Sequence, residues 1–288
     1  MKRIVFLSGK GGTGKTSLAG AFARLSERKI LADCDVDAAN LHLLLDTTVR
    51  EQGTYTGAQI AIKNPSLCVA CGACRQVCRF RAIDESYEID PFMCEGCGAC
   101  ITVCPTAAIS LEPSESGRWY TADTPQGPLA GAELHPGEET SGKLVTEVRK
   151  HADRLTESHE TEIAFQIIDG APGIGCPVIA SISGADAAIL VTEPTGSGRH
   201  DLERILGVLR HFRVPAFLVI NKADLCQEIS EAIEEHARES SICMLGRIPY
   251  DELVPQHLLK QESPVDDPES PAGQAMRAVF SRFLEVMR

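Results

Sequence analysis

A glycine-rich stretch near the N-terminus constrains the fold more than any other feature of the chain. It runs Ser8-Gly9-Lys10-Gly11-Gly12-Thr13-Gly14-Lys15-Thr16-Ser17 and contains the pattern G-x-x-x-x-G-K-T. The apolar residues 4–7 before it predict a buried strand, and residues 18–23 after it predict a helix. Glycines let backbone N–H groups surround a polyphosphate, while the positive end of the following helix faces the anion. The stretch therefore predicts a phosphate-binding loop within an α/β fold.

The side chains of this loop have distinct expected tasks. Lys15 should reach the β- and γ-phosphates of a nucleotide, and the Thr16 hydroxyl should bind Mg²⁺. The residues expected to contact the nucleotide are Gly9, Lys10, Gly11, Gly12, Thr13, Gly14, Lys15, Thr16 and Ser17. A chance glycine loop would lack a strand and a helix at the correct spacing, so we favour a true nucleotide site.

Composition and charge argue against several classes of protein. The chain has 288 residues, of which 43% are hydrophobic, and a formal net charge of −12. Because it contains no run of five or more basic residues, a nucleic-acid footprint is not expected. No apolar stretch approaches the length of a membrane span, and the first predicted strand begins at the N-terminus. These features predict a cytoplasmic protein without a signal peptide.

Eight of the 12 cysteines form a two-fold internal repeat, in which the offset from Cys68 to Cys94 recurs at every cysteine. Each quartet has the spacing C-x2-C-x2-C-x3-C, which is typical of bacterial two-cluster ferredoxins. In that arrangement the fourth cysteine of each quartet binds the other cluster. The predicted ligands of one 4Fe–4S cluster are Cys68, Cys71, Cys74 and Cys104, and those of the second are Cys94, Cys97, Cys100 and Cys78.

Zinc and disulfides are the alternatives for these cysteines. Zinc ribbons use two C-x-x-C pairs rather than two quartets, and disulfide scaffolds are typical of small secreted chains. The ferredoxin pattern expects a proline after the fourth cysteine of each quartet. Pro105 follows Cys104, but Arg79 follows Cys78. We expect Arg79 to leave ligation intact and to shift the potential of the cluster that Cys78 ligates.

Acidic residues follow two predicted strands. The strand at 29–34 leads into Asp33 and Asp35, and the strand at 163–169 ends at Asp169. Acidic residues at the carboxyl ends of parallel strands lie beside the ligand in open α/β sheets. These acidic residues are therefore expected to lie beside the bound ligand.

The rest of the chain alternates between predicted strands and helices. Strands are expected at 187–191, 216–220 and 244–248, and helices at 201–212 and 228–239. This alternation predicts a doubly wound parallel sheet. Before it, the turn-rich residues 111–140 suggest a hairpin with strands near 118–120 and 129–134, and a helix is expected from 141 to about 158. Residues 54–62 are expected to add one strand.

The loop form K-G-G-x-G-K-T, with Lys10 as a second lysine, resembles the deviant phosphate loop of the MinD, Mrp and nitrogenase-iron-protein ATPases, of the CobQ/CobB/MinD/ParA type. The resemblance implies that Lys10 crosses a dimer interface to the nucleotide of the partner subunit. It also implies that Asp35 orients the attacking water and that the Gly173 backbone lies near the γ-phosphate. On the same resemblance, Asp169 is expected to hold Mg²⁺ directly or through water, with Asp33 nearby. The partner would be an identical chain or a paralogous ATPase.

The same resemblance implies how the base is held. Asn221 and the backbone after Pro249 match the family's base-binding positions, and Lys222 follows in the string N-K-x-D. That string is also read as guanine recognition in small GTPases, but the deviant loop favours adenine. The predicted cofactors are therefore ATP, Mg²⁺ and two 4Fe–4S clusters.

Two further features have competing interpretations. The final helix carries an apolar strip that includes Met276 and Phe283, for which core packing is favoured over membrane binding. Cys176 lies seven residues after Asp169, where the nitrogenase iron protein has a cluster ligand. A buried or packing role for Cys176 is favoured over a bridging metal site, because no second cysteine in a matching motif completes the ligand set.

Together these features predict an α/β P-loop ATPase with a doubly wound parallel sheet and a small ferredoxin-like α+β insert. The predicted segments are 1–60 (ATPase), 61–112 (two-cluster ferredoxin), 113–140 (hairpin connection) and 141–288 (ATPase). Lys10, Lys15 and Asp35 are the predicted catalytic residues.

Three functions follow from this architecture. The favoured one is Mg²⁺-dependent ATP hydrolysis coupled to electron transfer or metallocluster assembly on a client metalloprotein; the sequence identifies neither the client nor an electron donor. The alternative is a MinD-like positioning or scaffolding ATPase whose clusters are structural or redox-sensing. A cobyrinic-acid amidase would share the ATPase fold but would need a glutaminase domain, for which this chain has no room.

Overall fold

The computed structural model describes residues 1–138, 141–159 and 161–287, and the chain divides into two compact units. Unit 1 comprises Met1–Gln52, Trp119–Glu133 and Ser141–Arg288, and unit 2 comprises Gly53–Arg118 and Leu134–Thr140. Residues 139 and 140 of the predicted connection lie outside the described residues.

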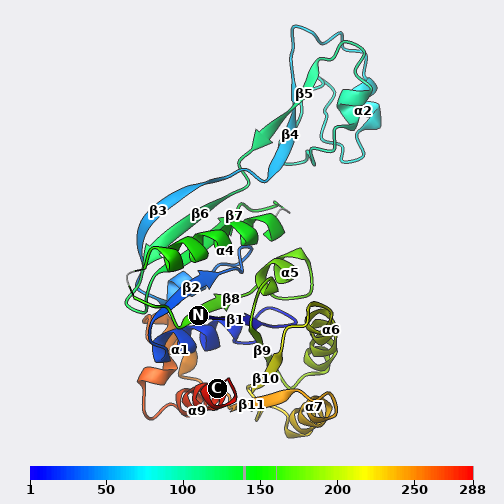
Figure 1. Ribbon diagram of the computed structural model, residues 1–288. Coiled ribbons are helices and arrows are strands. Elements are labelled where there is room, and N and C mark those ends of the chain that lie inside the picture. The colour runs from blue at the N-terminus through cyan, green and yellow to red at the C-terminus, as the bar shows by residue number, and fades with distance from the viewer. Residues whose placement is uncertain (139–140, 160, 288) are drawn as a thin grey trace. The chain divides into compact units, whose positions relative to one another are not determined.

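A nine-stranded, mostly parallel sheet forms the centre of unit 1 (Figure 1). Its strands, in spatial order, are β11 (Cys243–Ile248), β10 (Ala216–Asn221), β9 (Ala187–Thr192), β1 (Lys2–Leu7), β8 (Phe165–Asp169), β2 (Lys29–Asp33), β7 (Leu129–Leu134), β6 (Gly117–Asp123) and β3 (Thr48–Tyr55). Parallel pairing places β1 between β8 and β9, so that the carboxyl ends of these strands meet at one edge. The predicted α/β class with a largely parallel sheet is confirmed.

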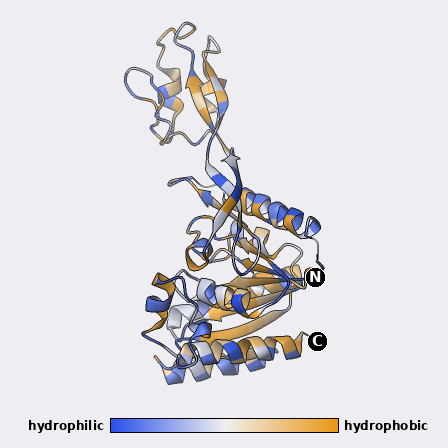
Figure 2. Ribbon diagram, turned by 90° about the vertical axis from the view of Figure 1, so that its left-hand side faces the viewer, coloured by the Kyte–Doolittle hydropathy of each residue, from blue (hydrophilic) through white to orange (hydrophobic). Residues whose placement is uncertain are grey.

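Helices cover both faces of this sheet. On one face lie α1 (Lys15–Leu25) and α9 (Pro271–Val286), and on the other lie α4 (Ser141–Glu157), α5 (Cys176–Ile182), α6 (Gly196–Phe212) and α7 (Gln227–Glu239) (Figure 1). The Phe22 ring of α1 lies 5.0 Å from the Phe6 ring and 5.0 Å from the Phe280 ring. Apolar residues concentrate in the central strands (Figure 2). Large side chains of both helices therefore share one core with the strands.

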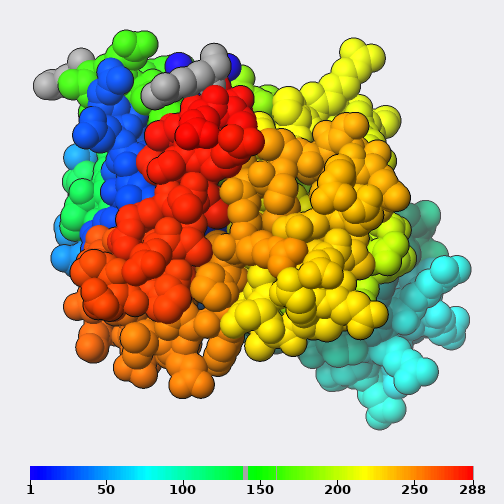
Figure 3. All heavy atoms as spheres, turned by 90° about the horizontal axis from the view of Figure 1, so that it is seen from below, coloured from blue at the N-terminus to red at the C-terminus, as the bar shows by residue number. Residues whose placement is uncertain are grey.

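The apolar strip of α9 belongs to this core, as expected. Met276, Val279 and Phe283 are at most 2% exposed, while the outer side of α9 lies at the surface beside the segment that precedes the helix (Figure 3). Among the described residues, no helix combines the length and apolar character needed to cross a bilayer.

Unit 2 carries the cysteine repeat. Its antiparallel strands β4 (Ala58–Lys63) and β5 (Ile109–Ser114) accompany two short helices, α2 (Ala73–Val77) and α3 (Ala99–Thr102). The two helices begin at corresponding positions of the repeat, and left-handed backbone recurs at the same offset in the pairs Ala70 and Gly96, Gly72 and Gly98, and Arg81 and Ala107. The sequence repeat is therefore also a backbone repeat.

Several predicted boundaries differ from the structure. Two strands, β3 and β4, replace the single strand expected at 54–62, because most of β3 is exposed and has no apolar pattern. The hairpin strands β6 and β7 join the large sheet, where β7 pairs with β2 in parallel. Helix α6 begins at Gly196, earlier than predicted, because the Thr195 side chain accepts the Gly198 N–H and caps the helix.

Candidate functional site

The predicted phosphate loop connects β1 to α1 and borders a cavity of about 980 Å³, part of which is open to solvent. Loop residues 11–17 line the cavity together with Asp35, Pro172 and Leu258. Gly14 has a φ of 86°, and a Cβ there would lie 2.2 Å from the Asn221 Nδ2 atom. Only glycine suits this position, which lets the backbone turn directly into α1.

Lys15 is buried between two carboxylates. Its Nζ atom lies 2.6 Å from Asp169 Oδ1 and 3.3 Å from Asp35 Oδ2, and its side chain is 5% exposed. Burial lowers the pKa of Lys15, but the carboxylates of Asp169 and Asp35 together raise it above its ordinary value. The amine therefore stays protonated and can meet a phosphate oxygen.

Three acidic side chains crowd the ends of β2 and β8. Asp33 is fully buried, and its carboxylate accepts the Leu41 N–H at 3.0 Å and the Asp35 N–H at 3.2 Å. Burial, with the nearby charge of Asp169, raises the pKa of Asp33 to about 8. Burial also raises the pKa of Asp35. A cation bound beside these side chains would favour their charged forms.

Unpaired oxygens show where a cation would fit. Among the described residues, Asp35 Oδ1, Asp169 Oδ2 and Thr13 Oγ1 are buried without a hydrogen-bond partner. Thr16 lines the same cavity, and its Oγ1 atom lies 3.4 Å from Lys15 Nζ. Carboxylate and hydroxyl oxygens suit a partly hydrated Mg²⁺, so the residues present fit this ion.

Lys10 contacts its own chain. Its Nζ atom lies 3.4 Å from Glu193 Oε2 and donates to Ser197 Oγ at 3.4 Å. Glu193 also pairs with Lys222, whose amine donates to the Gly12 carbonyl at 3.3 Å. A contact between Lys10 and the nucleotide of a partner subunit stays a prediction, and it requires Lys10 to leave Glu193.

The predicted base-binding residues lie behind the phosphate loop. Asn221 Nδ2 donates to the Thr13 carbonyl at 2.8 Å and so supports the loop. Asp224, the last residue of N-K-x-D, accepts the Tyr250 N–H at 2.6 Å, so one of its oxygens is already used. Asn221, Lys222 and Pro249 do not line the cavity, and their contacts with a base stay predictions.

The second predicted switch also makes internal contacts. Gly173 has a φ of 91°, and its N–H donates to the Ser8 carbonyl at 2.9 Å. An approach of this N–H to a γ-phosphate stays a prediction, and it requires the loop to leave Ser8. Cys176 is exposed at the start of α5, close to Gly142.

The sequence did not single out the apolar wall of the cavity. It is formed by Leu43 and Leu44 in the short helix η1 (Leu41–Leu44) and by Leu258 in α8 (Val254–Leu259). No motif marks such residues, because isolated leucines are common in any core.

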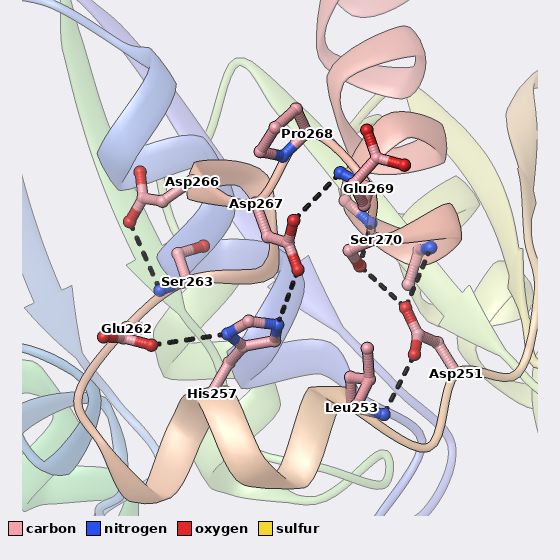
Figure 4. A network of polar contacts seen from close by, with 12 residues as sticks. Asp251, Leu253, His257, Glu262, Ser263, Asp266, Asp267, Pro268, Glu269 and Ser270 are labelled. Atoms are coloured by element: carbon pink, nitrogen blue, oxygen red, sulfur yellow. Dashed lines mark hydrogen bonds and ion pairs between the residues drawn. The ribbon is translucent and has the colours of Figure 1, made fainter.

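A polar network fixes α8 beside the cavity (Figure 4). His257 lies between two carboxylates, with Nδ1 3.5 Å from Glu262 Oε2 and Nε2 3.3 Å from Asp267 Oδ2. Asp267 directly follows the short helix η2 (Pro264–Asp266), and Asp251 accepts the Ser270 hydroxyl at 2.7 Å (Figure 4). These contacts connect α8 to the residues on either side of η2 and so position Leu258.

Two cavities in unit 2 separate the eight repeat cysteines into two groups. The space free of protein atoms at each cavity is about 350 Å³, part of which is open to solvent. One is lined by Cys68, Cys71, Cys74 and Cys104, and the other by Cys78, Cys94, Cys97 and Cys100. These groups match the two ligand sets expected from the spacing, including the exchange of the fourth cysteine.

Backbone donors approach the sulfurs in both cavities. The Ala108 N–H donates to Cys104 Sγ at 3.2 Å, and the Ala61 N–H donates to Cys94 Sγ at 3.4 Å. Such bonds stabilise thiolates and tune iron–sulfur clusters. The described residues contain no group of three or more His, Cys, Asp or Glu placed to hold one metal ion. Thiolates of a four-iron cluster bind separate irons, so they need not converge on one point.

A phosphate loop at the edge of a parallel sheet, with acids from neighbouring strands, defines a P-loop nucleotide-binding protein. Residues 4–265 match a family model described as the CobQ/CobB/MinD/ParA nucleotide binding domain. The chain belongs to this family, whose MinD and ParA members are ATPases.

Two relatives match nearly the whole chain. The uncharacterized protein MJ0578 of Methanocaldococcus jannaschii is 32% identical over 286 residues, which cover 98% of this chain and 96% of the relative. The septum site-determining protein MinD of Bacillus subtilis is 26% identical over 290 residues, which cover 98% of this chain and 88% of the relative. A second uncharacterized M. jannaschii protein, MJ0579, is 27% identical over 91% of each chain.

Solved structures show the same fold. MinD from Pyrococcus horikoshii, complexed with Mg-ADP, has a TM-score of 0.60 at 18% identity and covers 99% of this chain and 97% of its own. MinD in a MinC:MinD complex from Aquifex aeolicus has a TM-score of 0.58 at 17% identity, covering 99% and 96%. These solved structures support the fold, whereas the nucleotide site depends on the family match and the phosphate loop, and the cysteine repeat on its spacing and the two cavities.

Proposed function

We propose that this protein is a Mg²⁺-dependent ATPase that carries two 4Fe–4S clusters and couples ATP binding and hydrolysis to electron transfer or metallocluster assembly on a client metalloprotein. The observation that carries the proposal is the division of eight cysteines between two cavities, in the groups that the spacing predicts. The proposed cluster domain is residues 61–112, between ATPase segments 1–60 and 141–288.

The proposed hydrolytic roles follow from the cavity of unit 1. Lys15 neutralises charge on the β- and γ-phosphates, and Thr16 and Asp169 hold Mg²⁺ with Asp33 nearby. Asp35 orients the attacking water with its unpaired Oδ1 atom. Positioning and charge stabilisation dominate phosphoryl transfer, so these roles account for catalysis without a covalent intermediate.

The cysteine cavities would give the ATPase a redox function. When bound, a 4Fe–4S cluster supplies one-electron chemistry. The thiolates of each cavity hold the group, and the N–H donors of Ala61 and Ala108 stabilise the charge on the sulfurs. Free thiolate ligands favour a reducing compartment, which supports a cytoplasmic location.

The proposed active form is a dimer. Lys10 of each subunit would complete the nucleotide site of the other and so link hydrolysis to a rearrangement between subunits. The partner would be an identical chain or a paralogue; M. jannaschii contains two relatives of this chain, which supports either arrangement.

The test uses the full chain purified without oxygen. We expect close to eight irons and eight sulfides per chain and Mg²⁺-dependent ATP hydrolysis. We also expect MgATP to change the rate at which a ferrous chelator removes iron. Tetrahedral zinc without labile sulfide would contradict the cluster assignment. A chelation rate that is independent of nucleotide would contradict the coupling.

A MinD-like positioning or scaffolding role is the second candidate. It is favoured by the similarity to B. subtilis MinD, which extends over 98% of this chain. In that case the clusters would be structural or redox-sensing, and MgATP would change the oligomeric state without changing iron release or the EPR spectrum of the reduced protein.

A further inference from the structure

The two cysteine cavities correspond position by position. Every residue that lines the Cys68 cavity has a counterpart, at the offset of the repeat, that lines the Cys94 cavity. This includes residues other than cysteines: Ala108 corresponds to Ala82, and Ile109 corresponds to Ile83. The two cavities can therefore be compared position by position, and the substituted positions show how one site differs from the other.

The main substitutions make the Cys68 cavity more positive than the Cys94 cavity. Lys63 in the Cys68 cavity corresponds to Ile89 in the Cys94 cavity, and Thr106 corresponds to Phe80. At a third position the negative side chain, Glu95, belongs to the Cys94 cavity. The Cys68 cavity is therefore the more positive and polar of the two, while the Cys94 cavity is apolar and borders a carboxylate.

Lys63 is well placed to act on its cavity. It ends β4, where it pairs with Ile109 of the same cavity wall, and its side chain is only 10% exposed. Its amine binds Glu88, which opposes its charge, but the Glu88 side chain is 67% exposed and is therefore better screened by water. The exposed carboxylate therefore offsets the positive charge of Lys63 only in part.

The contacts to sulfur point the same way. Cys104 in the Cys68 cavity accepts the Ala108 N–H at 3.2 Å, and the Thr106 hydroxyl lies 3.8 Å from the same sulfur. In the Cys94 cavity, the Ala61 N–H approaches Cys94 Sγ at 3.4 Å, and Phe80 replaces the hydroxyl. Arg79, which the sequence suggested as a tuning charge, is exposed and does not line the Cys94 cavity.

We propose that Lys63 makes the two cluster sites unequal, so that the site formed by Cys68, Cys71, Cys74 and Cys104 has the higher reduction potential and receives the first electron. Adding an electron to a cluster held by four thiolates increases its negative charge. A nearby ammonium and additional hydrogen bonds to sulfur stabilise that charge, whereas Glu95 and apolar walls do not. This inference rests on the proposed presence of two 4Fe–4S clusters.

The experiment is an EPR-monitored potentiometric titration of the anaerobically prepared full chain, with dithionite as the electron donor. Iron and sulfide are counted first, because a chain without about eight of each would contradict the proposed clusters rather than their inequality. In the wild type we expect two components with different midpoint potentials. Two equal midpoints would overturn the inference.

Reciprocal variants test the role of Lys63. Lys63→Ile should lower the higher reduction potential by up to about 59 mV, which corresponds to a tenfold change in the equilibrium constant of a one-electron reduction. The lower reduction potential should not change. Ile89→Lys should raise only the lower potential. Glu88→Gln should raise the higher potential, because it removes the opposing charge.

A control variant keeps the inference testable if Lys63→Ile fails to assemble. Glu95→Val copies the residue found at the corresponding position of the Cys68 cavity, Val69, and should raise the lower potential alone. The inference would be overturned if the Lys63→Ile protein had full iron content and unchanged reduction potentials. It would also be overturned if this variant shifted the lower reduction potential.

Discussion

The nucleotide cavity of unit 1 and the cysteine cavities of unit 2 are built in opposite ways. Lys15 and Asp169 are 154 residues apart and are brought together by a parallel sheet with a large apolar core. The cysteines are brought together by two short, similar segments around a small core whose buried members are Ala61, Ile83, Cys100 and Ile109. A site that depends on a large core is formed before its ligand binds, whereas a site in a small module depends on the ligand for stability.

The largest expected effect is the loss of folded structure in unit 2 alone. Removing iron with a chelator should make the residues of unit 2 sensitive to protease while unit 1 stays resistant, because the small core of unit 2 buries little apolar surface. Limited proteolysis with mass spectrometry would locate the cuts. A control with EDTA, which removes Mg²⁺, should leave unit 2 intact when iron content is unchanged. Equal protection of both units after iron removal would contradict the contrast.

The second prediction concerns a substitution that should largely abolish ATP hydrolysis in unit 1 without unfolding this unit. Lys15→Ala should reduce the rate of ATP hydrolysis by about 100-fold or more, because it removes the buried amine that meets the phosphates. The iron content should not change. Lys150→Ala is a matched control, since Lys150 is an exposed lysine of α4 outside the cavity. A loss of iron together with activity would show that the two units do not behave independently.

Single cysteine variants test whether the fourth ligand is exchanged between quartets. Cys68→Ala and Cys104→Ala should damage the same cluster, because both line one cavity, and Cys78→Ala should damage the other. The measurements are iron content and the EPR spectrum of the reduced protein, with Cys226→Ala outside both repeats as the control. If Cys68→Ala and Cys78→Ala affect the same EPR component, the grouping is wrong.

The sequence identified some residues of these two regions and missed others. The phosphate loop and the acids after β2 and β8 could be found because glycine spacing and strand ends carry a local signal. The partners of Lys10, which include Glu193, could not be found, because they come from the end of another strand and no motif marks them. Leu258 was missed for the same reason.

In unit 2, the constant offset of the repeat pairs other residues besides the cysteines. Applied to every residue, it places Lys63 opposite Ile89 and Thr106 opposite Phe80. The sequence alone could not show that these residues line the cavities, because only Lys63 lies in a strand, β4, and the other three lie outside the named strands and helices. It drew attention to Arg79 instead, which is adjacent to a cysteine but exposed.

The smallest expected effect concerns the pH dependence of unit 1. Burial and Asp169 raise the pKa of Asp33 from 3.8 to about 8, so the folded chain binds a proton that the unfolded chain releases between these values. The free energy of unfolding should therefore fall as pH rises from about 4 to 8, by at least about 1 kcal/mol. Chemical denaturation of unit 1 without Mg²⁺, followed by the fluorescence of Trp119, would measure it.

Asp33→Asn should remove most of this slope, because the amide cannot ionise. Mg²⁺ should also reduce it, since a cation beside Asp35 and Asp169 favours the charged carboxylates. Asp46→Asn is a suitable control, because this carboxylate is outside the buried acidic group. An unfolding free energy that stays constant or rises between pH 4 and 8 would mean that Asp33 is charged in the folded protein without a cation. The acidic group would then need no bound metal to offset its charge.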